Sequence, residues 1–168
     1  LDPRDTQGDR AFLDILKALG AAVRWDGDSL TCASAELSAA DIDLGDAPDL
    51  FPMTAVMCAY AKGESRIYNA AHVRLKESDR IAATAQFLRD MGADIVETAD
   101  GCVIRGGRPL HGTKVNAFND HRILMAAAIA ALRASGETII SDGDCHRISY
   151  PDFVNDLRSL GASMEMIP

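Results

Sequence analysis

The sequence repeats itself at intervals of about 70 residues, and this repeat limits the possible folds more than any other feature. Three segments end alike: FLDILKALGA (12–21), AQFLRDMGA (85–93) and FVNDLRSLGA (153–162). Apolar residues recur at a helical spacing in each segment, as Phe12, Ile15 and Leu19 do in the first. This spacing predicts three amphipathic helices, each ended by a glycine in the C′ position.

A second helix type also recurs, in PDLFPMTAVMCAYAKG (48–63) and NDHRILMAAAIAALRASG (119–136). Both segments have an aspartate near their start and a glycine at their end, and they are apolar on nearly all faces. A helix that is apolar all round is a buried helix. Each is followed by a β-rich run, SRIYNA (65–70) or TIISD (138–142).

Two hairpins are predicted around the turns DGD and ADG, formed by AAVRW (21–25) with SLTCA (29–33) and by ADIVET (93–98) with CVIRG (102–106). The repeating unit is therefore an amphipathic helix, a hairpin, a further strand, a buried helix and a strand. Two units are nearly complete and the last helix begins a third. The fold class is α/β (α+β), with helices inside and strands and outer helices around them.

Composition places the chain among ordinary globular proteins. It has 168 residues, 48% hydrophobic and 25% charged, and a net charge of -8. This charge, with scattered basic residues, disfavours a nucleic-acid partner. The sequence has no apolar run of about 18 residues and no signal peptide, so a cytoplasmic protein that does not enter the membrane is expected.

The cysteines and the first residues give two further expectations. Cys32, Cys58, Cys102 and Cys145 lie far apart, without the spacing of a zinc site. Four buried thiols in a reducing cytoplasm are expected, with no metal. The chain begins at Leu1 without an initiator Met, which predicts a fragment of a longer protein.

The densest polar cluster is HVRLKESDR (72–80), between a strand and a helix. Ser78 or Asp79 can cap that helix, and Arg80 lies in its first turn. Free N–H groups and the helix dipole attract anions there, and an arginine adds bidentate recognition of a carboxylate or phosphate. The alternative is a solvated helix start with a local ion pair.

Two more clusters lie at the starts of the buried helices. In NDHR (119–122), Asp120 is a good N-cap and Arg122 lies in the first turn, while His121 is a cap neighbour, a general acid or an anion ligand. In GDAPDLFPM (45–53), Asp49 is either a plain N-cap or a general base that needs neighbouring cations. If each helix start were capped for its own sake, the aspartates at these starts would be explained, but the arginines beside them would not.

Together these motifs resemble those of the 5-enolpyruvylshikimate-3-phosphate (EPSP) synthases. The resemblance rests on K-E-S-D-R, then D-H-R in an Ala-rich helix, then S-Y-P-D-F, and runs from TQGDRAFLDILKALGA (6–21) to SYPDFVNDLRSLG (149–161). The related UDP-N-acetylglucosamine enolpyruvyl transferases share the fold but lack the K-E-S-D-R form. The resemblance implies two similar domains, each of three βαβαββ units with helices inside. Residues 1–168 then form part of the C-terminal domain, and the N-terminal domain is absent.

The resemblance also implies an activity. This family transfers the enolpyruvyl group of phosphoenolpyruvate to the 5-hydroxyl of shikimate 3-phosphate and releases phosphate, in the shikimate pathway of aromatic amino acid biosynthesis. It needs no metal or organic cofactor. Asp49 matches the acid that takes the hydroxyl proton, and Lys76 matches a residue that touches shikimate 3-phosphate near that hydroxyl.

The remaining matches concern phosphoenolpyruvate. Glu77 matches the carboxylate that exchanges a proton with its methylene carbon, a role that requires burial of Glu77. Arg80 and Arg122 match the arginines that hold it, with His121 beside them. We expect the two arginines to converge on one solvent-open surface.

Two positions depart from the family pattern. Ile148, read as part of a strand, stands where a lysine is common, and His72 stands where an asparagine is common. The isolated chain is expected to be inactive and to self-associate at incomplete sheet edges. Two other readings stay open, a non-enzymatic interaction domain of this fold and an RNA-end-processing enzyme built on a similar repeat.

Overall fold

The computed structural model describes residues 8–167, so the chain start at Leu1 lies outside the described residues. The helices, with η marking 3-10 turns, are η1 (Gly8–Arg10), α1 (Ala11–Ala18), η2 (Pro48–Leu50), α2 (Phe51–Tyr60), η3 (Ala71–Leu75), α3 (Arg80–Asp90), α4 (His121–Ala131), η4 (Gly143–Ile148) and α5 (Phe153–Ser159). The strands are β1 (Ala22–Asp26), β2 (Ser29–Ala33), β3 (Asp41–Asp43), β4 (Gly63–Tyr68), β5 (Asp94–Glu97), β6 (Cys102–Gly106), β7 (Lys114–Val115) and β8 (Ile139–Ile140).

The described strands form one four-stranded sheet and two two-stranded sheets. The four-stranded sheet has the order β3-β4-β6-β5, in which β3 and β4 are parallel and the β5–β6 hairpin is antiparallel to its neighbours. Among residues 8–167, the β1–β2 hairpin and the parallel pair β7–β8 each form a separate sheet. By the repeat, β1–β2 corresponds to β5–β6 and β7–β8 corresponds to β3–β4.

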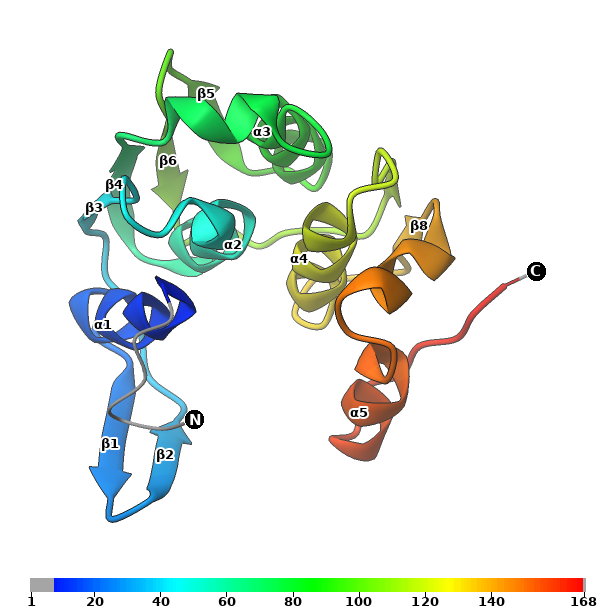
Figure 1. Ribbon diagram of the computed structural model, residues 1–168, viewed down its shortest axis with the longest axis horizontal. Coiled ribbons are helices and arrows are strands. Elements are labelled where there is room, and N and C mark those ends of the chain that lie inside the picture. The colour runs from blue at the N-terminus through cyan, green and yellow to red at the C-terminus, as the bar shows by residue number, and fades with distance from the viewer. Residues whose placement is uncertain (1–7, 168) are drawn as a thin grey trace.

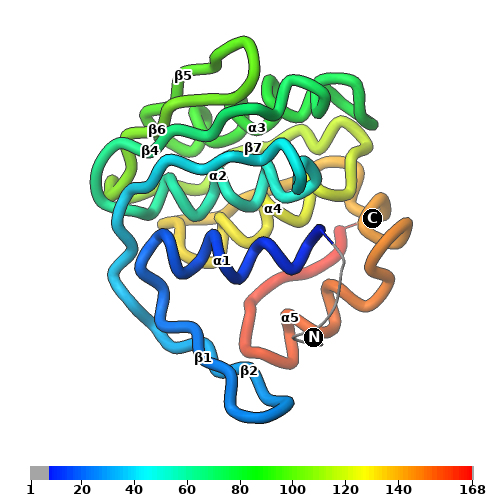
Figure 2. Tube along the Cα trace, turned by 60° about the vertical axis from the view of Figure 1, so that its left-hand side comes forward, coloured from blue at the N-terminus to red at the C-terminus, as the bar shows by residue number. Residues whose placement is uncertain are grey.

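The buried helices form the middle of the molecule. Seven residues of α2 are buried: Phe51, Pro52, Thr54, Ala55, Val56, Cys58 and Ala59. Helix α2 packs against both α3 and α4, which also contact each other. Figures 1 and 2 show α2 and α4 side by side at the centre, with the β5–β6 hairpin and α5 farther out. The predicted helix core is confirmed.

Glycine ends the repeated helices as the sequence indicates. Gly20, Gly92 and Gly161 follow α1, α3 and α5 with φ angles of 84°, 94° and 97°. These angles lie in the left-handed region, which a residue with a Cβ enters at a cost. The same C′ geometry three times confirms that the three helices are equivalent elements of one repeat.

Two expectations about local structure are wrong. Cys32 is exposed, whereas Cys58, Cys102 and Cys145 are buried. The repeat gives the reason, because the position in β6 equivalent to Cys32 is Ile104, which is fully buried where β6 lies between β4 and β5. Strand β2 has no second neighbour among the described residues. Ile148, expected in a strand, ends the 3-10 turn η4.

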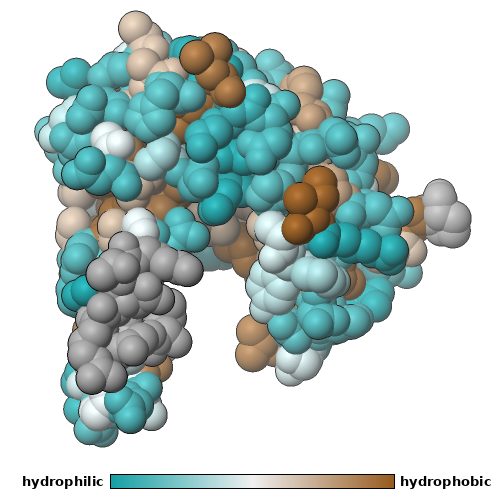
Figure 3. All heavy atoms as spheres, viewed as in Figure 1, coloured by the Kyte–Doolittle hydropathy of each residue, from teal (hydrophilic) through white to brown (hydrophobic). Residues whose placement is uncertain are grey.

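Hydrophilic residues cover most of the face shown in Figure 3, with scattered apolar groups. In that view an open space separates the arm that holds the β1–β2 hairpin from the arm that holds α5. Large apolar side chains that remain exposed include Leu75, Ile148 and Leu160. Within residues 8–167, no helix is both long and apolar enough to cross a membrane.

Candidate active site

Two helix N-termini build the site, and an aspartate caps each of them. The Asp79 carboxylate accepts a hydrogen bond of 3.0 Å from the Ala82 amide at the start of α3. The Asp120 carboxylate accepts one of 2.9 Å from the Arg122 amide at the start of α4. The Asp120 cap was predicted, and of the two residues considered for α3, Ser78 and Asp79, the structure has Asp79 as the cap. The two caps place Arg80 and Arg122 in the first turns of neighbouring helices.

Arg80 lies at the centre of a carboxylate cluster, with only 1% of its side chain exposed. Its Nε donates to Oδ2 of Asp120 at 2.8 Å, and its Nη2 donates to Oδ1 of the same residue at 3.2 Å. Nη1 donates to Oδ1 of Asp49 at 2.7 Å, and Nη2 also donates to Oε2 of Glu77 at 2.6 Å. Three carboxylates therefore surround one guanidinium group.

Asp49 joins the remaining cations to this cluster. Its Oδ2 lies 3.5 Å from Nη2 of Arg122, whose Nη1 donates to the Asp49 carbonyl oxygen at 3.3 Å. Its Oδ1 lies 3.4 Å from Nζ of Lys76. The structure thus joins five of the six residues chosen from the sequence in one cluster, with Lys76, Arg80 and Arg122 at the Asp49 carboxylate and Glu77 attached through Arg80.

The pKa values in the cluster follow from burial and charge together. Burial raises the pKa of Asp49, but the charges of Arg122, Lys76 and Arg80 outweigh it, and the net pKa is lowered. Burial likewise raises the pKa of Asp120, and the hydrogen bond and charge of Arg80 reverse this to a net lowering. Both carboxylates are therefore ionised at neutral pH.

Three expectations about these residues are corrected. Arg80 is buried rather than solvent-open, because Asp120 and Asp49 enclose its guanidinium group, although it does converge with Arg122 on Asp49. Glu77 is not buried, since 47% of its side chain is exposed. Asp49 caps no helix, because Ala47 and Leu50 occupy the cap positions of η2 and α2, which frees its carboxylate for the cations.

The other sequence candidates occupy varied surroundings. His121 is buried, and its Nδ1 has no hydrogen-bond partner among the described residues. His72 is exposed on η3. Ile148 is 70% exposed, and its neighbour Arg147 pairs with Asp144 at 3.3 Å. Within residues 8–167, none of these side chains forms a hydrogen bond or ion pair with the cluster around Asp49.

Sequence reasoning missed several contacts. Asp120 was taken as a cap, yet it also binds Arg80, and Ser78 donates to its Oδ2 at 2.9 Å. Asp9 lies 3.8 Å from Arg122. Arg74 donates to the Thr98 carbonyl oxygen at 2.7 Å and so ties η3 to the β5–β6 turn. Such contacts join residues far apart in the chain, and spacing within a motif does not reveal them.

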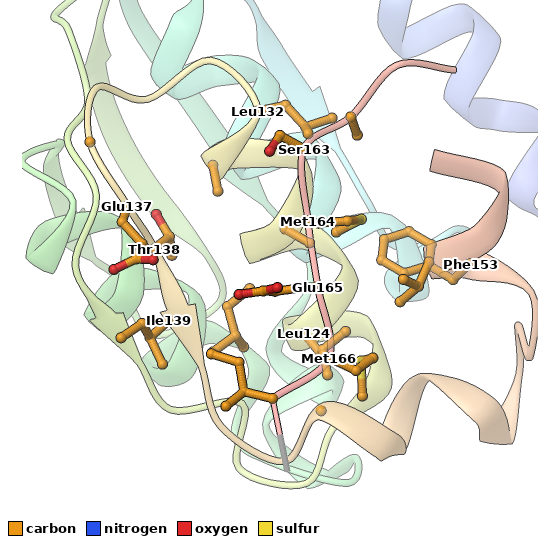
Figure 4. A pocket seen from close by; sticks show the side chains of 18 of the residues that line it. Leu124, Leu132, Glu137, Thr138, Ile139, Phe153, Ser163, Met164, Glu165 and Met166 are labelled. Carbon is orange, nitrogen blue, oxygen red and sulfur yellow. The ribbon is translucent and has the colours of Figure 1, made fainter. Parts of the chain in front are cut away.

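A cavity of about 660 Å³ lies elsewhere, between α4, β8 and the final residues (Figure 4). Leu124, Phe153 and Met164 line it, and its charged lining residues, Glu137 and Glu165, are acidic. An anionic ligand is disfavoured there. Among residues 8–167, no group of three or more His, Cys, Asp or Glu is placed to hold a metal ion.

A family model and named relatives match most of the chain. The family model described as EPSP synthase (3-phosphoshikimate 1-carboxyvinyltransferase) matches residues 1–157. The chain belongs to the EPSP synthase family. It is 54% identical over 164 residues to the 3-phosphoshikimate 1-carboxyvinyltransferase of Methanocorpusculum labreanum, and 46% identical over 161 residues to that of Methanocaldococcus jannaschii.

Solved structures agree with this membership. An EPSP synthase from Acinetobacter baumannii superposes with a TM-score of 0.80 at 31% identity, over 91% of this chain and 39% of that one. The enolpyruvyl transferase NikO from Streptomyces tendae gives a TM-score of 0.77 at 25% identity, over 92% of this chain and 35% of that one. The predicted enolpyruvyl-transferase fold is confirmed. The match to the Methanocorpusculum relative covers 98% of this chain but only 39% of that protein.

Proposed function

We propose that this chain supplies the phosphoenolpyruvate-binding part of an active site that transfers an enolpyruvyl group to shikimate 3-phosphate and releases phosphate. The observation that carries the proposal is the convergence of Lys76, Arg80 and Arg122 on Asp49 at two helix N-termini. A carboxylate and a phosphate on one small substrate need several fixed cations. Cations at helix N-termini stabilise developing negative charge with little reorganisation.

Asp49 is proposed as the base that takes the proton from the 5-hydroxyl. With Arg122, Lys76 and Arg80 beside it, the pKa of Asp49 is lowered, which makes it a weak base before substrate binds. Bound anions add negative charge next to Asp49 and share its cations. Both effects raise the pKa of a carboxyl group and strengthen it as a base. Substrate binding would therefore activate the base.

Glu77 is proposed to exchange a proton with the methylene carbon of phosphoenolpyruvate. Its Oε2 is 2.6 Å from Arg80 Nη2, and a substrate carboxylate that takes this Nη2 would release Glu77 toward the substrate. Lys76, whose Nζ is 3.4 Å from Asp49, is proposed to contact shikimate 3-phosphate near the reacting hydroxyl. His121 is proposed as a neighbour of the phosphoenolpyruvate site, and no metal or organic cofactor is required.

Residues 1–168 are proposed to form part of the C-terminal domain of a longer enzyme, whose N-terminal domain supplies the rest of the site. The length of this chain supports the proposal, because the chain spans 39% of the Methanocorpusculum protein. A cytoplasmic location is proposed, and the four free cysteines fit a reducing compartment. Nucleic acid and membrane are not proposed as partners, since the chain carries a net charge of -8.

A phosphate-release assay tests the proposal. The full-length enzyme, supplied with both substrates, should release phosphate, whereas the isolated chain should not. Loss of one half-site removes substrate positioning, which can contribute on the order of 7–11 kcal/mol to catalysis. A folded but inactive full-length protein would favour the alternative, a non-enzymatic domain that retains the fold. Turnover by the isolated chain would contradict the half-site proposal.

Self-association of the isolated chain is also proposed, with a second copy as the partner. The β1–β2 hairpin and the β7–β8 pair each have an edge that no other described strand covers. Cys32 is exposed on the first, and Ile139 is 42% exposed on the second. Open strand edges with exposed apolar groups favour pairing between copies.

A further inference from the structure

We propose that Asp120 is a positioning residue that couples the two arginines, an inference that rests on the function proposed above. Asp120 is 0% exposed and lies at the first turn of α4. Its role as a helix cap accounts for one of its hydrogen bonds. The others reach the K-E-S-D-R segment, where no cap requires them.

The four contacts of Asp120 divide evenly between its two oxygens. Oδ1 accepts from the Arg122 amide at 2.9 Å and from Arg80 Nη2 at 3.2 Å. Oδ2 accepts from Arg80 Nε at 2.8 Å and from Ser78 Oγ at 2.9 Å. One buried carboxylate thus holds the side chain of one arginine and the backbone of the other.

This arrangement decides which edge of Arg80 meets a ligand. Asp120 occupies the edge formed by Nε and Nη2, and a bidentate contact fixes the plane of the guanidinium group. The outer donors are left to Asp49 through Nη1 and to Glu77 through Nη2. These two side chains are 36% and 47% exposed, so an incoming carboxylate can replace them, whereas Asp120 stays in place.

The same carboxylate sets the position of Arg122. Its Oδ1 caps α4 through the Arg122 amide, so Asp120 fixes the start of the helix from which the Arg122 side chain extends toward Asp49. Weakening Asp120 would therefore disturb both cations together. Binding of phosphoenolpyruvate should suffer much more than binding of shikimate 3-phosphate.

The test compares Asp120→Asn with wild type in the full-length enzyme. An amide accepts at one oxygen only, so the variant keeps either the Oδ1 contacts, to the Arg122 amide and Arg80 Nη2, or the Oδ2 contacts, to Arg80 Nε and Ser78, and in either case weakens the hold on Arg80. We expect the KM for phosphoenolpyruvate to rise on the order of 10- to 100-fold, as for loss of hydrogen bonds to a charged group. The KM for shikimate 3-phosphate should change less than about twofold, within the scatter of such measurements.

Asp79→Asn is the matched control. It weakens the cap of α3 and the ion pair with Arg74, but within residues 8–167 the Asp79 carboxylate forms no hydrogen bond or ion pair with the side chain of Arg80 or Arg122. A merely structural role of Asp120 would lower the melting temperature and the amount of active enzyme in both variants and leave both KM values unchanged. That result would overturn the inference, as would equal increases in KM for phosphoenolpyruvate in the two variants.

Ser78→Ala decides the matter if Asp120→Asn fails to fold. It removes one of the hydrogen bonds to Oδ2 of Asp120 and leaves the cap intact. The KM for phosphoenolpyruvate should then rise on the order of 2- to 10-fold, and an unchanged KM would overturn the inference. A folded wild-type enzyme without turnover would refute the proposed function. An active wild type with an insensitive Asp120 would refute this inference alone.

Discussion

Replacement of Arg80 by methionine should destabilise the chain strongly at neutral pH. Asp120 is 0% exposed and loses the cation that forms two hydrogen bonds with it, while Ser78 and the Arg122 amide remain. Leaving one member of a buried ion pair without its partner costs about 3–5 kcal/mol. The free energy of unfolding at pH 7, measured by urea denaturation, should fall by about this amount.

The pH dependence separates this mechanism from simple loss of packing. In wild type, burial raises the pKa of Asp120, but the hydrogen bond and charge of Arg80 outweigh burial and lower it overall. The ionised Asp120 therefore stabilises the fold above the pKa it has in the unfolded chain, and this stabilisation is lost as pH falls through its pKa in the folded chain. Without Arg80, burial raises the pKa of Asp120, and the penalty disappears on protonation. The difference between variant and wild type should therefore shrink from pH 7 toward about pH 4, near the unfolded value.

The control is Arg105→Met. Arg105 pairs with Glu64 at 2.7 Å, but both side chains are more than half exposed, at 59% and 54%. Such a pair contributes about 0–1 kcal/mol. Two results would refute the assignment of Arg80 and Asp120 as an interdependent buried ion pair. One is a loss of stability for Arg80→Met as small as that for Arg105→Met, and the other is a loss of stability that does not change with pH.

The remaining predictions concern the proposed function. Glu77→Gln in the full-length enzyme should lower turnover by roughly 10²–10⁴, the range for loss of a general acid or base, with little change in the KM for phosphoenolpyruvate. Near-normal turnover would remove Glu77 from the reaction. Arg122→Lys should mainly raise that KM, since lysine lacks the planar fork of arginine, and an unchanged KM would remove Arg122 from the binding site. Sedimentation of the isolated chain should show self-association that grows with concentration, and a monomer at every concentration would contradict it.

The repeat made most of the fold predictable, because glycine at C′ and helices that are apolar all round carry strong local signals. The error at Asp49 shows where such signals stop. Alignment by the nearest aspartate places Asp49 opposite Asp120, but the cap position of η2 belongs to Ala47. When the two cap positions, Ala47 and Asp120, are aligned, Asp49 corresponds to Arg122 in the repeat. The side chains of Asp49 and Arg122 also contact each other. A shift of two residues within a helix start is invisible to hydrophobic periodicity.

Burial of individual site residues was predicted less well. Glu77 was expected to be buried and is 47% exposed, whereas Arg80 was expected to face solvent and is 1% exposed. Spacing within K-E-S-D-R places both residues at the start of one helix but does not reveal which of them faces α4. Asp120 supplies that information, because its carboxylate draws Arg80 inward from a segment that is distant in the sequence.

The side chains of the cluster differ in exposure. The buried ones are held in place by the chain, whereas a ligand can displace the exposed ones. Asp120 and Arg80, at 0% and 1% exposure, form the inner pair, while Asp49, Lys76 and Glu77, at 36%, 36% and 47%, form the outer part. A rigid inner pair orients the cation before any ligand arrives, which is the condition for electrostatic preorganisation. The outer carboxylates accept hydrogen bonds from Arg80, and in the proposed function they leave it when the substrate anion binds. Under the proposed function, the inner pair sets the geometry of binding, and the outer residues are the ones free to move protons.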